Sequence, residues 1–248
     1  MMHWTIIADD AHRCPPPPLF DVMETSLHRD LKKLYATDDR QCEVRLGVHR
    51  IDVVADGCLI EVQVASLSAI RDKIRVLLRD HPVIVVKPII ARKTLVKRVR
   101  RDGPVASRRL SPKRGTILDL FDELIHFTRV FPHERLTLDV PLIEIEEWRY
   151  PGHGRRRRWH RDDHQVEDQK LVAVHQTYRF RTAGELAELI AGPLPAPFHT
   201  GQLAHSLGVP RWMAQRIAYC LRHTGALCEV GKQRNARLYQ FTADRKVA

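Results

Sequence analysis

The sequence lacks closely spaced cysteines and long apolar runs. Its five cysteines are widely separated and form no Cys-x-x-Cys pair, so we expect neither a zinc module nor a disulfide framework. No apolar run approaches the roughly 18 residues of a membrane span, and no signal-peptide core precedes the prolines at Pro15–Pro18. We therefore expect a cytoplasmic protein with no membrane partner.

Acidic residues are scarce relative to basic ones. The chain has 41 Lys and Arg against 30 Asp and Glu, which gives a net charge of +11. Such a surplus favours a polyanionic partner, and nucleic acid is the simplest candidate. Its 248 residues, 44% of them hydrophobic, suffice for one full core and a second, smaller domain.

Two carboxylates lie inside strand-like apolar runs. Asp52 falls within His49–Val54 and Glu61 within Cys58–Val64, and the dipeptide Asp56-Gly57 between them is typical of a tight hairpin turn. The hairpin would bring both side chains together, where like charges repel unless a cation or a proton intervenes. Paired carboxylates are ligands that Mg²⁺ or Mn²⁺ prefers.

The order of predicted elements around these carboxylates indicates an α/β core with a mixed sheet. The periodicity predicts a helix over Glu24–Tyr35, strands over Cys42–Leu46, His49–Val54 and Cys58–Val64, a helix over 67–78 and a strand over Val83–Val86. A helix between two strands of one sheet implies a crossover connection.

This α-β-β-β-α-β order, with Asp52 and the run Glu61-Val62-Gln63, resembles the PD-(D/E)XK superfamily of restriction-endonuclease-like nucleases over about a quarter of the chain. The resemblance implies a metal-dependent DNA endonuclease in which Asp52 and Glu61 bind Mg²⁺ or Mn²⁺. It also implies that Gln63 occupies a catalytic position usually held by lysine. Nucleases of this type often act as dimers, so the resemblance also implies a homodimer, although no residue pattern indicates its interface.

The departure at Gln63 opens alternatives, because an amide cannot act as a general base near neutral pH. Lys73, on the following helix, is a catalytic candidate that could supply the missing ammonium, and Glu43 is the candidate for a third metal ligand. Two rival interpretations remain: an ion pair of the carboxylates with Arg50 or Arg71, or a catalytically silent, DNA-binding regulator built on the same fold.

Two strongly basic segments interrupt the rest of this first domain, residues 20–180. The segment Lys87–Arg114 has eleven Lys or Arg and one acid, which predicts an exposed arm that either follows a phosphate backbone or binds nothing. The other is the predicted tip of a hairpin extension between strands over Leu136–Trp148 and Leu171–Phe180. Its DNA-binding candidates are Arg155, Arg156, Arg157, Arg158 and Trp159, which would suit RNA as well.

The C-terminal part, residues 181–248, resembles a winged-helix domain. Helices are predicted over Ala183–Ile190, 200–208 and Arg211–His223, and a β-hairpin over Ala226–Phe241. In that family the helix after the turn typically reads the major groove and the wing contacts the backbone, although some members bind protein instead. By resemblance, the DNA-binding candidates are Arg211, Gln215, Arg216, Lys232, Arg234 and Arg237. A nucleoid-associated location follows if DNA is the partner.

Overall fold

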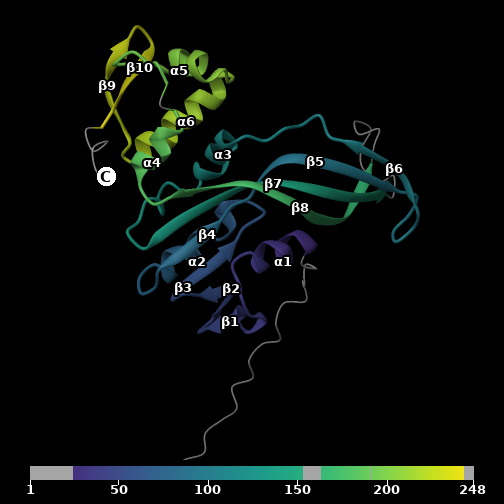
Figure 1. Cartoon of the computed structure of the whole chain (residues 1–248). Coiled ribbons are helices and arrows are strands. Elements are labelled where there is room, and N and C mark those ends of the chain that lie inside the picture. The colour runs from purple at the N-terminus through teal and green to yellow at the C-terminus, as the bar shows by residue number, and fades with distance from the viewer. Residues whose placement is uncertain (1–24, 153–162, 191, 243–248) are drawn as a thin grey trace, which may run out of the picture.

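The computed structural model describes residues 25–152, 163–190 and 192–242 (Figure 1). Within them, an eight-stranded mixed sheet carries helices on its faces, and a smaller two-stranded sheet lies in the C-terminal part. The expected α/β class with a mixed sheet is confirmed. None of the helices in these ranges has the length and apolar content that crossing a bilayer requires.

The first elements follow the expected α-β-β-β-α-β order. They are α1 (Ser26–Lys33), β1 (Cys42–Leu46), β2 (His49–Ala55), β3 (Cys58–Val62), α2 (Arg71–Leu77) and β4 (Val83–Val86). The strands β1, β2 and β3 form an antiparallel meander, and α2 connects β3 to its parallel neighbour β4. This arrangement leaves α1 and α2 to flank the strands that bear Asp52 and Glu61.

Local chemistry explains why α1 forms and docks. Thr25 is its N-cap and accepts a hydrogen bond from the backbone N–H of His28, and the two lysines of its last turn suit the negative end of the helix dipole. Leu27 and Leu31, four residues apart, are fully buried against the sheet. This packing directs the side chain of His28 toward β3.

The β2–β3 turn also follows from the sequence. Asp56 and Gly57 have φ values of 50° and 73°, the left-handed pair that a two-residue turn of the mirror-image type requires. Asp tolerates this conformation and Gly adopts it freely, so the Asp-Gly pair sets the register that joins Ala55 to Cys58. That register decides which residues of β2 and β3 are neighbours.

The centre of the sheet is a long hairpin of β7 (Leu136–Pro151) and β8 (His164–Phe180). Two other strands pair in parallel with successive parts of β7. They are β4, beside residues 136–139, and β5 (Ile89–Arg98), beside residues 142–149. The expected second strand of this extension, 171–180, is longer than predicted and begins at His164. The expected arginine-rich tip, Arg155 to Trp159, lies outside the described residues.

The segment 87–114 is not the free arm that its charge suggested. It forms β5 and β6 (Val105–Leu110), an antiparallel hairpin at one edge of the sheet. Its cations flank apolar residues such as Leu95 and Val96, which are buried, and several cations pair with glutamates of β7 and β8. A count of basic residues within the segment cannot show that glutamates from β7 and β8 lie beside it.

The segment between β6 and β7 contains only a short helix. A 3₁₀ turn, Ile117–Asp119, leads into α3 (Leu120–Leu124), after which the chain continues as successive turns. These turns still bury Phe127 and Phe131 completely, so the apolar spacing serves the core without a continuous helix.

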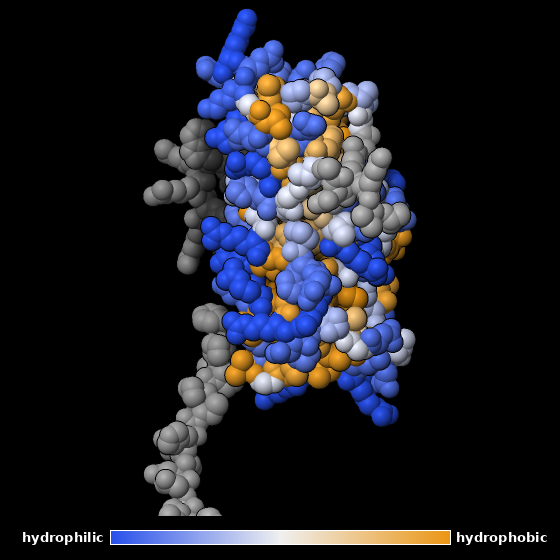
Figure 2. Space-filling model, turned by 90° about the vertical axis from the view of Figure 1, so that its left-hand side faces the viewer, coloured by the Kyte–Doolittle hydropathy of each residue, from blue (hydrophilic) through white to orange (hydrophobic). Residues whose placement is uncertain are grey.

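The C-terminal unit consists of α4 (Ala183–Glu188), α5 (Thr200–Leu207), α6 (Arg211–His223), β9 (Leu227–Gln233) and β10 (Ala236–Phe241). An isolated antiparallel bridge joins Phe198, before α5, to Tyr239 of β10. One cluster of buried residues runs from the sheet through α3 into α6. Figure 2 shows the left flank of the molecule, where hydrophilic side chains cover most of the surface and hydrophobic patches are small.

Candidate functional site

Asp52 and Glu61 come together at the open end of the β2–β3 hairpin, as the sequence predicts. They directly follow the last pair of the ladder, Val53 and Ile60. Asp52 Oδ2 accepts a hydrogen bond from the backbone N–H of Val62 at 2.8 Å, and a backbone hydrogen bond from Asp52 reaches the Glu61 carboxylate. Each carboxylate is therefore held by the backbone of the strand that bears the other.

His28 of α1 holds Asp52 from one side. Its Nε2 lies 3.4 Å from Asp52 Oδ2 and 2.9 Å from the carbonyl oxygen of Val62. Because a carbonyl only accepts hydrogen bonds, Nε2 carries a proton. Burial raises the pKa of Asp52, but the hydrogen bonds from His28 and from the Val62 N–H outweigh it and hold that pKa below its usual value. Asp52 is therefore ionised at neutral pH.

Lys73 of α2 reaches Glu61 from the other side, with Nζ 2.5 Å from Oε1. The ammonium also donates to the carbonyl oxygen of Arg50. Burial raises the pKa of Glu61, and although Lys73 lowers it, the charge of Asp52 adds to the increase, so the pKa lies above its usual value. Glu61 is 4% exposed, and its Oε1 accepts no hydrogen bond of regular geometry from the described residues.

Gln63 is turned toward the loop that follows β3. Its side-chain nitrogen donates to the carbonyl oxygen of Ser66 at 2.7 Å. The cation in contact with the carboxylate pair is thus Lys73, from the neighbouring helix. The rival ion pairs with Arg50 and Arg71 are not formed with the carboxylate pair, because Arg50 binds Glu43 and Arg71 binds Asp72.

Glu43, the candidate third ligand, does not complete a metal cluster. It forms ion pairs with Lys32 of α1 and Arg50 of β2, and its own φ is 58°. Across the described part of the chain, no group of three or more His, Cys, Asp or Glu side chains is arranged to hold a metal ion. The candidate site is therefore the pair Asp52 and Glu61, with His28 and Lys73 beside it.

A buried lysine that sequence reasoning did not single out holds the loop that joins the strand of Glu61 to the helix of Lys73. Lys87, 4% exposed, donates to the carbonyl oxygens of Val64 and Ala65, and its Nζ lies 3.5 Å from Glu123 Oε1. Burial lowers the pKa of Lys87, which Glu123 partly offsets. A lysine directly after the apolar run of β4 was the available signal, because a cation at the end of a buried strand needs partners.

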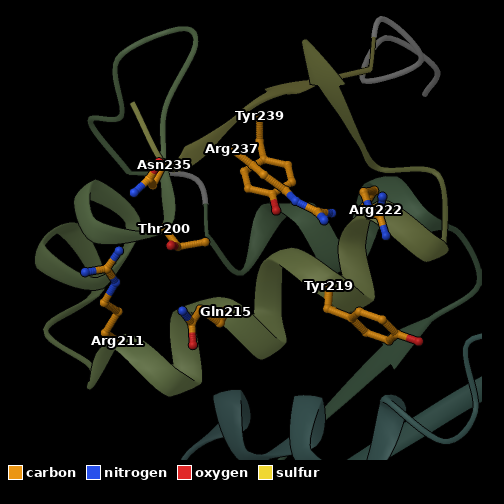
Figure 3. A pocket seen from close by; sticks show the side chains of 9 residues that line it. Thr200, Arg211, Gln215, Tyr219, Arg222, Asn235, Arg237 and Tyr239 are labelled. Carbon is orange, nitrogen blue, oxygen red and sulfur yellow. The ribbon is translucent and has the colours of Figure 1, made fainter. Parts of the chain in front are cut away.

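A second concave surface lies between α6 and the β9–β10 hairpin. This groove has a volume of about 300 Å³, and Figure 3 shows side chains projecting into it from successive turns of α6 and from the hairpin above. Its polar and aromatic lining consists of Thr200, Arg211, Gln215, Tyr219, Arg222, Asn235, Arg237 and Tyr239. Glu229 pairs with Arg222 at 3.5 Å and with Arg237 at 3.3 Å, which braces two of the three arginines.

The groove includes some of the expected DNA contacts and not others. Arg211, Gln215 and Arg237 line it, whereas Lys232 and Arg234 are exposed on the hairpin outside the lining. Arg216 also lies outside the lining, and its Nη1 is 2.5 Å from Asp122 Oδ1 of α3. The resemblance that named Arg216 carried no information about the docking of α6 on α3.

Comparisons with known proteins identify a family and a relative, and neither description names an activity. The family model described as "Domain of unknown function (DUF8091)" matches residues 25–181. A protein of Treponema pallidum (strain Nichols), described as "Uncharacterized protein", is 31% identical over 219 residues, which are 88% of this chain and 85% of that relative. No solved structure matches the chain.

Proposed function

This chain belongs to the family described as a domain of unknown function, DUF8091, and from its own geometry we propose that it is a metal-dependent DNA endonuclease that hydrolyses phosphodiester bonds. The observation that carries the proposal is the convergence of a buried carboxylate, Glu61, and a half-buried one, Asp52, with the Lys73 ammonium in contact with Glu61. The meander flanked by α1 and α2 supports a restriction-endonuclease-like core, and the three C-terminal helices with their hairpin support a winged helix.

The donor set suits a divalent ion such as Mg²⁺ or Mn²⁺. Asp52 keeps a low pKa, and Glu61 Oε1 faces the Lys73 ammonium, whose place a hard cation would take, so both residues would then offer oxygen ligands to that ion. When bound, such an ion lowers the pKa of water and stabilises charge on a phosphate.

The neighbouring side chains have separate roles in this proposal. His28 orients the Asp52 carboxylate through its protonated Nε2, and Lys73 positions Glu61. An incoming phosphate would attract the Lys73 ammonium, which then stabilises negative charge on the phosphodiester. Gln63 contributes to the shape of the loop after β3 through Ser66.

Cleavage assays on three variants test the proposal. Plasmid and branched DNA are incubated with Mg²⁺ or Mn²⁺, using wild type, Glu61→Gln and Asp52→Asn. Asp72→Asn is the matched control, because Asp72 is an exposed carboxylate on α2 directly beside Lys73. Metal-dependent cleavage that both site variants lose and the control keeps supports the proposal; metal-independent cleavage, or cleavage by all variants, contradicts it.

A second candidate is a catalytically silent DNA-binding regulator. It is favoured by the contacts themselves, since His28 and Lys73 already bind the two carboxylates, and by the arginine-lined groove of α6. Calorimetric titration with Mn²⁺ separates the two candidates. Binding that Glu61→Gln abolishes favours the nuclease, whereas DNA binding with neither Mn²⁺ binding nor cleavage favours the regulator.

Two further measurements address the choice of nucleic acid and the oligomeric state. Matched RNA and DNA strands report which nucleic acid is cut, because the 2′-hydroxyl distinguishes them. Sedimentation with and without DNA reports whether the chain acts as a homodimer, which cutting both strands of a duplex would favour. A cytoplasmic, nucleoid-associated location goes with DNA as the substrate.

A further inference from the structure

We propose that the β5–β6 hairpin is a nucleic-acid-binding surface that holds a phosphodiester backbone along the exposed edge of the sheet. The inference deepens the proposed function and rests on it for the choice of partner, because it names the surface on which the substrate would lie. It concerns binding alone and involves neither Asp52 nor Glu61.

The position of β6 makes it accessible. Within the described residues β6 pairs with β5 on one side only, and all six of its residues are exposed. An edge strand presents backbone N–H groups that have no partner in the sheet, and such groups donate readily to phosphate oxygens. The hairpin stands at the right-hand end of the sheet in Figure 1, away from the C-terminal unit.

The cations of the hairpin and its flanks divide into two sets, and this division carries the proposal. The first set is paired with glutamates of β7 and β8: Arg92 with Glu144, Lys93 with Glu147, Arg98 with Glu167 and Arg108 with Glu146. The second set has no ion pair among the described residues: Lys97, Arg100, Arg101, Arg109, Lys113 and Arg114. The paired cations neutralise buried or half-buried acids and so contribute to the fold. The unpaired cations neutralise no acid of the described residues and remain available to a ligand.

The unpaired cations extend along the whole hairpin. Arg100 and Arg101 lie in its turn, Arg109 lies opposite Leu95, and Lys113 and Arg114 follow β6 beside the start of β5. At about 3.3 Å per residue, the strip beside residues 90–98 is about 26 Å long. Duplex DNA carries about 15 phosphate charges over that length, so a linear polyanion can meet these cations in succession.

Charge complementarity selects this occupant over others. A second copy of the chain would place like charges opposite one another on the same edge, which disfavours pairing. Acidic peptides and anionic lipid surfaces share the charge of nucleic acid, and the exposed Val99 and Val105 could contact lipid. The unpaired cations follow one another from the turn through Arg109 to the segment after β6, and this succession fits a linear backbone of phosphates better than a plane of headgroups.

Two matched double variants test the inference. Arg101→Gln/Arg109→Gln removes two unpaired cations, and Arg92→Gln/Arg108→Gln removes two paired ones from the same hairpin, with Arg108 and Arg109 adjacent in sequence. Affinity for a labelled duplex of about 20 base pairs is measured by anisotropy from about 50 to 200 mM salt. Chelator is present throughout, so cleavage plays no part in the result.

The plot of log affinity against log salt has a negative slope, and the unpaired double variant should make it shallower by about 1.8. The reason is that each phosphate neutralised by a cation contributes about 0.9 to the steepness. The paired control should leave the slope nearly unchanged. Lys113→Gln/Arg114→Gln, beyond the strand, should make the slope shallower as well. Equal effects of the two hairpin variants, or none from either, overturn the inference, as does binding to polyglutamate or phosphatidylserine vesicles in place of nucleic acid. Full binding without metal-dependent cleavage would refute the nuclease and leave this surface intact.

Discussion

At the scale of single residues, the two carboxylates differ in electrostatic environment although they are neighbours. Asp52 has a lowered pKa because His28 and a backbone N–H bind it, whereas Glu61 has a raised pKa because burial and the charge of Asp52 outweigh Lys73. Both were identified from the sequence because carboxylates inside apolar strands require compensation. Which of them would be harder to ionise depended on side chains of α1 and α2.

Glu61→Gln should make stability less sensitive to pH. Since the pKa of Glu61 in the folded protein lies above its ordinary value of 4.5, the wild type loses stability relative to the variant as pH rises through the interval between these two pKa values. Above that interval the difference is constant. Urea unfolding of both proteins at about pH 4 and about pH 7 measures this change, and a wild type that gains stability relative to the variant as pH rises would refute the assignment.

Lys73→Met should raise the pKa of Glu61 further, because burial and Asp52 remain while the attractive charge is removed. The free energy of unfolding should fall by about 2 kcal/mol, the scale for a buried charged group left without its partner. Carboxyl NMR titration follows the pKa of Glu61, with Lys33→Met on α1 as a control. An unchanged titration of Glu61 would show that the two side chains are not in contact in solution.

At the scale of elements, helix α1 supports the site through its packing. Leu27 and Leu31 are fully buried, and the same helix presents His28 to Asp52 and Lys32 to Glu43. The spacing of leucines predicts the helix and the burial of Leu27 and Leu31, but it places Leu34 on the same stripe, whereas Leu34 at the helix end is exposed. The partners of its polar side chains were not predictable, because these lie on strands that are distant in sequence.

Leu31→Ala should destabilise the protein by about 2 to 5 kcal/mol, since it opens a cavity between α1 and the sheet. Leu34→Ala at the end of the same helix is the matched control: Leu34 is 54% exposed, so its truncation should change stability by less than about 0.5 kcal/mol. Chemical denaturation compares the two variants. Equal effects would mean that α1 does not pack on the sheet through Leu31.

At the scale of the whole molecule, the C-terminal unit shares a core with the sheet. The buried cluster that contains Ile51 and Phe121 also contains Met213 and Leu221, and Cys220 donates weakly to the carbonyl oxygen of Phe121. The sequence separated residues 181–248 as a second domain because they resemble a winged helix. The buried cluster nevertheless continues across this boundary, from the sheet into α6.

A shared core predicts one cooperative unfolding transition. Fluorescence of Trp212 on α6, isolated by replacing the other three tryptophans with Phe, should lose its native signal at the same temperature at which circular dichroism reports loss of the sheet. Phe121→Ala, which opens a cavity beneath α6, should lower both midpoints together. Two separated transitions in the wild type would show that the C-terminal unit folds independently.

The sequence by itself determined what depends on neighbouring residues and short loops. It set the α-β-β-β-α-β order, the Asp56-Gly57 turn and the meeting of Asp52 with Glu61, because hydrophobic periodicity and turn chemistry act locally. The tertiary structure alone decided that Lys73 and His28 flank the carboxylates, that Arg216 turns to Asp122, and which cations of the β5–β6 hairpin are paired. The reason is that an ion pair depends on which strands and helices become neighbours, and residues far apart in the sequence carry no local signal of that proximity.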